Sequence, residues 1–183
     1  HILLDMFYED LKGKLKIGST LRGIGPCYQD KIARVGLRFH DVKSGKLKSK
    51  FEALSKKHLE LIKGFPYDEK RLNDQVSEWF EAIEFLKQFE ITDTEELLNK
   101  EHGKGSNILA EGAQGTLLDL NFGTFPFVTS SNTLSSGACT GLGIAPSKIR
   151  KVFGVFKAYT TRVGAGPFAT EQDNQVGEQL MKN

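Results

Sequence analysis

The chain has 183 residues, a formal net charge of +2, and 39% hydrophobic and 26% charged side chains. This is ordinary for a globular protein, so composition and charge give no reason to expect a nucleic-acid or membrane partner. No stretch is apolar enough to cross a bilayer. The two cysteines, Cys27 and Cys139, stand in unrelated contexts. That argues against a disulfide framework and favours a reducing, cytoplasmic location.

The first segment, residues 1–45, contains the glycine-rich run KIGSTLRGIGPCYQDKIARVGLR at 16–38. A serine–threonine pair lies between glycines there, and arginines follow. Because arginine binds phosphate through two hydrogen bonds, this composition is typical of a phosphate site, although it does not establish one by itself. The residues concerned are Ser19, Thr20, Arg22, Arg34 and Arg38.

Residues 46–104 are rich in charge and predict a helical subdomain. One apolar face recurs at spacings of three and four from Leu47 to Ile62, and Gly64 to Pro66 would end that helix. A second amphipathic helix is expected from Leu72 to Leu86. Thr92 and Glu95 match a capping box that would open a short third helix ending near Gly103. We interpret these apolar stripes, including Trp79, as core packing.

Residues 105–183 change character, because only Glu111 and Asp119 carry charge between 105 and 147. The run at 107–112 predicts a buried strand that ends in a tight turn, and 151–163 predicts a second strand. A short helix is expected between them. This order predicts an α/β fold, in which part of a mostly parallel central sheet carries the helical subdomain as an insertion.

The run EGAQGTLLDLNFGTFPFVTSSNT at 111–133 follows the first predicted strand. Its backbone N–H groups, hydroxyls and amide suit phosphate and nucleoside oxygens, and its phenylalanines would anchor the loop to a core or wall off a base. An ordinary glycine-rich connection, whose hydroxyls bond its own backbone, is an equal alternative. Glu111 and Asp119 could be an acid–base pair, but hydrogen bonding to the loop backbone is favoured.

Several common signatures are absent from these residues. There is no G-x-x-x-x-G-K-[ST] and no G-x-G-x-x-G in a strand–helix setting. No histidine, cysteine or carboxylate cluster has metal-ligand spacing, and the four histidines are scattered. The sequence therefore predicts no metal site in this chain.

Three glycine-rich motifs, taken in order, resemble the adenylosuccinate synthetase family. GSTLRGIGPCYQDKIARVGLR is similar to its G-T-T-G-R-G-I-G-P-x-Y-x-D-K-x-x-R-x-G-[LI]-R motif. EGAQGTLLDLNFGTFPFVTSSNT is similar to E-G-A-Q-G-x-x-L-D-x-x-x-G-T-Y-P-[FY]-V-T-S-S-x-T, and KAYTTRVGAGPFATE to K-A-Y-x-T-R-V-G-x-G-P-[FL]-P-T-E. Most of the chain is covered, and residues 46–104 match least.

The resemblance implies a ligase of purine biosynthesis. The family uses GTP and Mg²⁺ to join L-aspartate to IMP, giving adenylosuccinate, GDP and phosphate. By resemblance Thr20 and Thr129 bind the IMP phosphate, Gln114 and Leu118 line the IMP pocket, and Val163 lies near the ribose. Arg34 matches an arginine that reaches the partner's IMP phosphate in a homodimer.

The sequence also departs from the family pattern. Leu21, Ser136 and Ala169 replace two glycines and a proline. The family's G-D-E-G-K-G-K segment with its catalytic aspartate, its aspartate-binding loop and its guanine site do not occur among these residues. No catalytic residue or Mg²⁺ ligand is therefore expected in this chain, and by itself it should be inactive. A non-catalytic nucleotide-binding or interaction module is the alternative.

Overall fold

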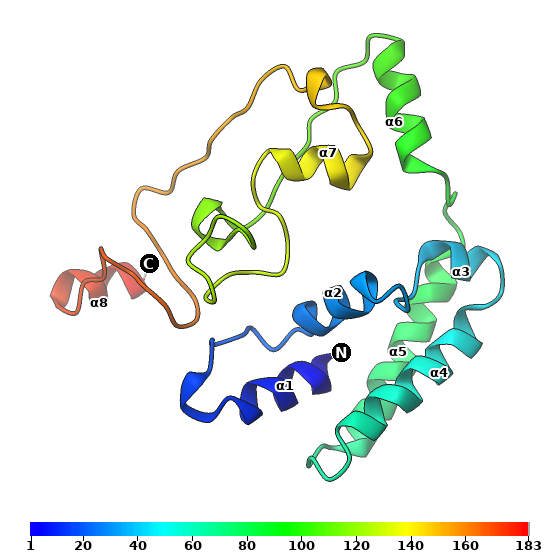
Figure 1. The fold of residues 1–183 in the computed structure, drawn as a ribbon, viewed down its shortest axis with the longest axis horizontal. Coiled ribbons are helices and arrows are strands. Elements are labelled where there is room, and N and C mark those ends of the chain that lie inside the picture. The colour runs from blue at the N-terminus through cyan, green and yellow to red at the C-terminus, as the bar shows by residue number, and fades with distance from the viewer. Residues whose placement is uncertain (183) are drawn as a thin grey trace.

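The computed structural model describes residues 1–182, and its regular elements are helices (Figure 1). Short 3-10 turns, η1 (Gly13–Leu15), η2 (Thr116–Leu118) and η3 (Pro146–Lys148), connect some of them. The α-helices are α1 (Ile2–Leu11), α2 (Ile24–Ile32), α3 (Phe39–Lys43), α4 (Leu47–Leu61), α5 (Glu69–Leu86), α6 (Thr94–Gly103), α7 (Ser136–Leu142) and α8 (Gln175–Lys182).

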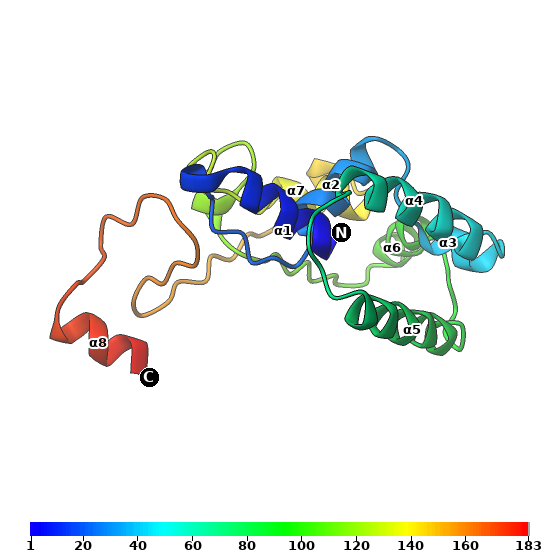
Figure 2. The same cartoon turned by 90° about the horizontal axis from the view of Figure 1, so that it is seen from below.

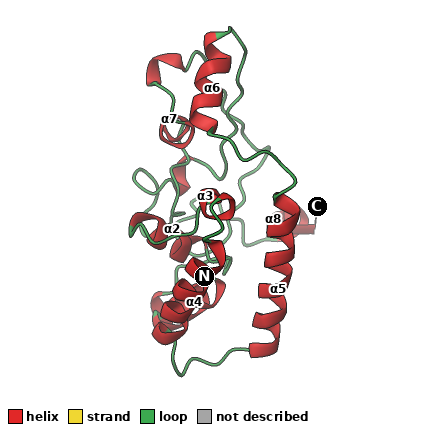
Figure 3. Cartoon of the chain, turned by 90° about the vertical axis from the view of Figure 1, so that its right-hand side faces the viewer, coloured by secondary structure: helices red, strands yellow, loops and turns green. Residues whose placement is uncertain are grey.

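The predicted α/β fold is wrong for this chain, because residues 1–182 contain no strand (Figure 3). The two predicted strands, 107–112 and 151–163, contain neither strand nor helix. A strand needs a neighbour for its backbone hydrogen bonds, and no described segment pairs with either run. Val155 and Phe156 are accordingly 96% and 94% exposed. The β-branched pattern was present, but its pairing partner was not.

The helices predicted between residues 46 and 104 are confirmed, with one change at a helix start. Helix α4 buries Leu47 and Leu54, as the apolar face predicted. Helix α6 is capped by Asp93, whose carboxylate accepts a hydrogen bond from the Glu96 N–H at 3.0 Å. Thr92 is therefore not the cap, because the acceptor one residue later reaches the third helical N–H.

The buried apolar cluster joins side chains of α3, α4 and α5. Helices α4 and α5 overlap in Figure 1, but their backbones lie apart in Figure 2, so it is their long side chains that meet between them. Val42, Leu47 and Ile83 form the cluster, and Trp79 packs against it. The Trp79 ring stacks on Phe51 with centroids 5.2 Å apart. These contacts confirm that the stripes are core packing. None of the described helices is long and apolar enough to cross a membrane.

Candidate functional site

The first and third glycine-rich segments touch through their backbones. The Ala165 N–H donates to the Ile17 carbonyl at 3.0 Å. Gly18 and Gly164 pack so closely that a Cβ on Gly18 would lie 2.8 Å from the Gly164 Cα. Glycine is required at this crossing, since a side chain there would force the two segments apart. Thr20 and Val163 lie within two residues of it.

The second segment is joined to the third by one guanidinium group. Arg162 Nη2 donates to the Phe127 carbonyl at 3.1 Å, and the same side chain donates through Nε and Nη2 to the Ala165 carbonyl. The second segment also approaches the first, because a Cβ on Gly25 would lie 3.7 Å from Ser130 Oγ. All three glycine-rich segments therefore meet in one region of the fold.

Two buried carboxylates on α1 hold the first loop in place. Asp5 accepts hydrogen bonds from the Ser19 hydroxyl at 2.8 Å and the Gly23 N–H at 2.9 Å. Glu9 accepts from the Gly18 N–H at 2.9 Å and from the Ser19 N–H at 3.3 Å. Burial alone would raise the pKa of Glu9, but hydrogen bonds from Lys12 and from these N–H groups outweigh it and lower that pKa.

A third buried carboxylate, Asp119, organises the second loop. Its side chain accepts from the N–H groups of Asn121 at 2.9 Å, Phe122 at 3.1 Å and Thr133 at 2.7 Å. Burial opposes the charge, but these donors prevail and the pKa of Asp119 lies below its ordinary value. Glu111 is exposed. Asp119 therefore binds the loop backbone through hydrogen bonds, which is the role that the sequence favoured over an acid–base pair with Glu111.

Two of the three phenylalanines of this loop differ from expectation, whereas Phe127 is half-buried. Phe122 and Phe125 are 73% and 77% exposed, so within this chain they neither anchor the loop to a core nor enclose a base. The loop is held instead by hydrogen bonds to one charged centre. Aromatic content predicted burial, but within the described residues these two rings remain largely exposed.

The predicted binding residues fall into three groups. Leu118, the last residue of η2, accepts a hydrogen bond from the Thr129 N–H at 2.9 Å, so these two are held together. Thr20 and Val163 flank the crossing of the first and third segments. Gln114 and Arg34 are exposed, and the Arg34 guanidinium makes no hydrogen bond or ion pair within residues 1–182.

The residues that sequence reasoning missed are the loop-holding side chains Asp5, Glu9 and Arg162. One signal was available, because Asp5 and Glu9 are four residues apart just before a glycine-rich loop. That spacing puts both carboxylates on one face of a helix. Arg162 gave no such signal, since its acceptor on Phe127 is 35 residues away.

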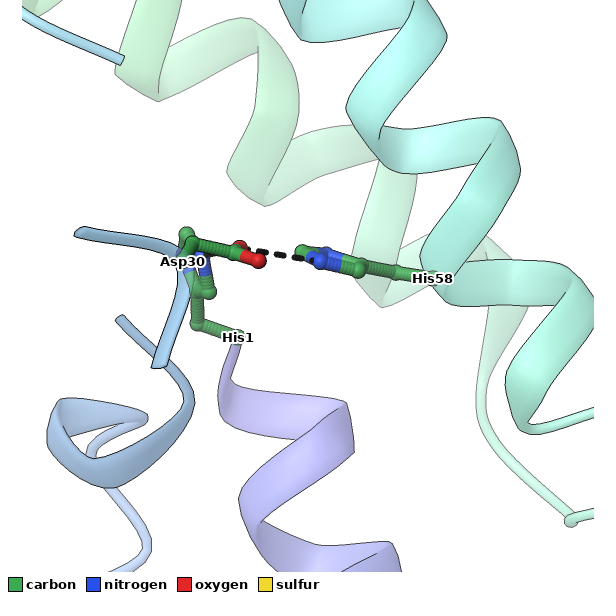
Figure 4. Close-up of side chains that lie close together, drawn as sticks. All are labelled: His1, Asp30 and His58. Atoms are coloured by element: carbon green, nitrogen blue, oxygen red, sulfur yellow. Dashed lines mark hydrogen bonds and ion pairs between the residues drawn. The ribbon is translucent and has the colours of Figure 1, made fainter. Parts of the chain in front are cut away.

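Two of the four histidines, which lie far apart in the sequence, come together with Asp30 in the fold. His1 Nε2 and His58 Nε2 lie 2.8 Å and 2.9 Å from the same oxygen, Asp30 Oδ2 (Figure 4). The three residues come from separate parts of the sequence, so no local spacing could reveal them. Burial lowers the pKa of His58, although Asp30 acts in the opposite direction.

Comparison with known proteins gives a consistent result. The family model "Adenylosuccinate synthetase" matches residues 1–183. The chain is 54% identical over 183 residues to the Flavobacterium psychrophilum adenylosuccinate synthetase, and 50% over 180 residues to one from Bacteroides fragilis. The alignments cover 100% and 98% of this chain, and 43% and 42% of those proteins.

A solved structure agrees with these relatives. The fully ligated adenylosuccinate synthetase from Plasmodium falciparum superimposes with a TM-score of 0.87 at 37% identity, over 100% of this chain and 43% of that one. The matches define the class as a ligase family of purine biosynthesis. The chain belongs to the adenylosuccinate synthetase family, and it spans about 43% of the length of the relatives it matches.

Proposed function

We propose that these residues belong to a protein that uses GTP to ligate IMP and L-aspartate into adenylosuccinate. Phosphorylation of the purine oxygen by GTP turns a poor leaving group into a good one, which aspartate then displaces. In this proposal the chain supplies part of the IMP site. The catalytic aspartate, the GTP and aspartate sites and the ligands of Mg²⁺ come from residues that this chain does not contain.

The observation that carries the proposal is the convergence of the three glycine-rich segments. Thr20 and Thr129 supply hydroxyls for the IMP phosphate, Gln114 supplies an amide, and Leu118 and Val163 line the nucleoside. None of the three polar side chains is used in a hydrogen bond within residues 1–182. Unused donors on loops whose backbone is fixed by hydrogen bonds to buried carboxylates are suited to binding a phosphate.

Unusual backbone conformations occur at or beside several of the proposed IMP-binding residues. Within the described chain, the non-glycine residues at positive φ are Leu21 (54°), Arg34 (63°) and Gln114 (64°). Two are assigned binding residues, and the third follows Thr20. A left-handed conformation costs a side-chain-bearing residue energy and often marks a functional site.

The direct test is a titration of the chain with IMP, followed by amide NMR, with inosine as the control that lacks the phosphate. Each neutral hydrogen bond contributes about 0.5–1.5 kcal/mol, so we expect a dissociation constant no tighter than about millimolar. Shifts should concentrate at Thr20, Gln114, Thr129 and Val163. Absence of shifts there at saturating IMP, or equal shifts with inosine, would contradict the proposal.

The proposal includes a homodimer in which Arg34 reaches the partner's IMP phosphate. In the whole protein, Arg34→Leu should weaken IMP binding by roughly 10- to 100-fold, because a charge-assisted contact is lost. Mixing Arg34→Leu subunits with Thr129→Ala subunits gives dimers with one site that has both residues. Activity at low IMP should then exceed that of either variant alone. Activity equal to the parental average, with subunit exchange confirmed, would place Arg34 in its own subunit.

A further inference from the structure

We propose that His1, Asp30 and His58 bind a divalent transition-metal ion of the Zn²⁺ class. The three side chains come from the residue before α1, from α2 and from α4, and they point toward one another (Figure 4). Their ligand atoms all lie within 4.8 Å of one another. An ion at this point would tie α1 and α2, which flank the first glycine-rich loop, to the helical region.

The geometry is close to that of a tetrahedral site. At a metal–nitrogen distance of about 2.1 Å, two imidazole rings bound tetrahedrally have centroids about 5 Å apart. The centroids of His1 and His58 are 5.2 Å apart. Ligand atoms in such a site are separated by about 3.4 Å. The nitrogen–oxygen distances of 2.8 and 2.9 Å would widen by about half an ångström, and the two nitrogens, which lie within 4.8 Å of each other, would have to reach the same separation.

The cluster brings together three ligand groups, two imidazoles that each also reach Asp30 at hydrogen-bond distance and the carboxylate between them. Both imidazoles approach Asp30 Oδ2, while Oδ1 accepts no hydrogen bond from any described residue. Two imidazoles and one carboxylate are a donor set that Zn²⁺ and Co²⁺ prefer and Mg²⁺ does not.

The exposure of the three side chains would allow a metal ion to enter the cluster. The side chains of Asp30 and His58 are 8% and 12% exposed, so two ligands are shielded from water. His1 is 30% exposed, which leaves a route for the ion and room for a water molecule as fourth ligand.

The experiment is a titration of the chain, carrying one extra residue ahead of His1 so that no free α-amino group adjoins that imidazole. Zn²⁺ binding is measured by calorimetry, and Co²⁺ binding by visible absorption, which is intense for four-coordinate Co²⁺. We expect one equivalent of each, with a dissociation constant of about micromolar or tighter, and no uptake of Mg²⁺ at this cluster. A weak, six-coordinate Co²⁺ spectrum or no saturable uptake of one Zn²⁺ would overturn the proposal.

Variants separate metal binding from hydrogen bonding. His58→Gln keeps a donor for Asp30 but removes the imidazole ligand, and it should weaken Zn²⁺ binding by at least about 10-fold, as Asp30→Asn should. The matched control His102→Gln, outside the cluster, should bind as the unaltered chain does. Unchanged affinity in His58→Gln would overturn the proposal. If a variant fails to fold, X-ray absorption of the Zn²⁺-loaded unaltered chain decides, because two imidazole ligands are required.

Discussion

The helical region, residues 39–103, and the loop region, residues 105–168, are held by different forces. Every apolar side chain that is buried in the described chain precedes residue 84, whereas the one buried side chain after residue 105 is the carboxylate of Asp119. The helical region excludes water from an apolar cluster, and its one buried carboxylate, Asp41, is paired with Lys50. The loop region arranges its backbone around buried charge and leaves Phe122 and Phe125 exposed. A charge-poor sequence is therefore not necessarily an apolar core.

Removing a buried side chain from the helical core should have the largest effect on stability. Ile83→Ala removes a buried side chain from the cluster with Val42 and Leu47, and should lower the free energy of unfolding by about 2–4 kcal/mol. Chemical denaturation followed by circular dichroism measures the loss. The matched control Leu61→Ala, at a site 52% exposed on α4, should cost less than about 1 kcal/mol. Equal losses would show that the core is not where the structure places it.

The loop region should respond locally instead. In Asp119→Asn one carboxylate oxygen becomes an amide nitrogen, which cannot accept the Thr133 N–H, while the remaining oxygen can still accept from Asn121. Amide hydrogen exchange at Thr133 should therefore accelerate by about 10-fold or more, with a smaller change at Asn121 and none in α5. Glu111→Gln is the control and should change none of these rates. Acceleration spread evenly over the chain would contradict a local role.

Acid should weaken the hydrogen bonds around both loop-holding carboxylates, Glu9 and Asp119. The pKa values of Glu9 and Asp119 are lowered in the folded chain from ordinary values of 4.5 and 3.8. Their stabilisation is therefore complete above those ordinary values and is lost as pH falls through the lower folded values. Exchange protection of Ser19 and Thr133, corrected for intrinsic rates, should fall below about pH 4.

Glu9→Gln tests this assignment, since it removes the titrating group beside the first loop. The acid dependence at Ser19 should disappear, while that at Thr133 should persist. If both dependences persist, other groups control the first loop.

The smallest expected effect concerns Leu21, which lies at φ 54° in the first loop. Leu21→Gly relieves a left-handed strain of about 1–2 kcal/mol but makes the unfolded chain more flexible by about 0.4–1 kcal/mol. A net stabilisation of up to about 1 kcal/mol should appear in the unfolding midpoint. Leu15→Gly, a substitution at another exposed leucine, in η1, should destabilise. Destabilisation by both would mean that the Leu21 side chain contributes more than its backbone costs.

The helices of residues 46–104 could be predicted because their information is local. Apolar residues from Leu47 to Ile62 repeat with the helical period, and Gly64 and Pro66 interrupt it, so a short window suffices. The boundary at α6 was less certain by one residue, because Thr92 and Asp93 are both good caps and the choice depends on which side chain reaches an N–H.

The three glycine-rich motifs could also be recognised in the sequence, because each is a contiguous run of residues with its own spacing. Their convergence could not. The contact of Gly18 with Gly164 spans 146 positions, and the Arg162 hydrogen bond to Phe127 has no counterpart in the spacing of either segment.

The family, the helices and the polar character of the loops could be predicted from the chain alone, since these follow from the order of neighbouring residues. The folded structure was needed to show which carboxylates hold the loops, that His1 and His58 share Asp30, and that the β-branched run at 151–163 has no strand pairing within the described residues. The physical reason is the same in each case. Hydrogen bonding, ion pairing and strand formation all need a partner, and that partner is brought close by the fold rather than by the chain order.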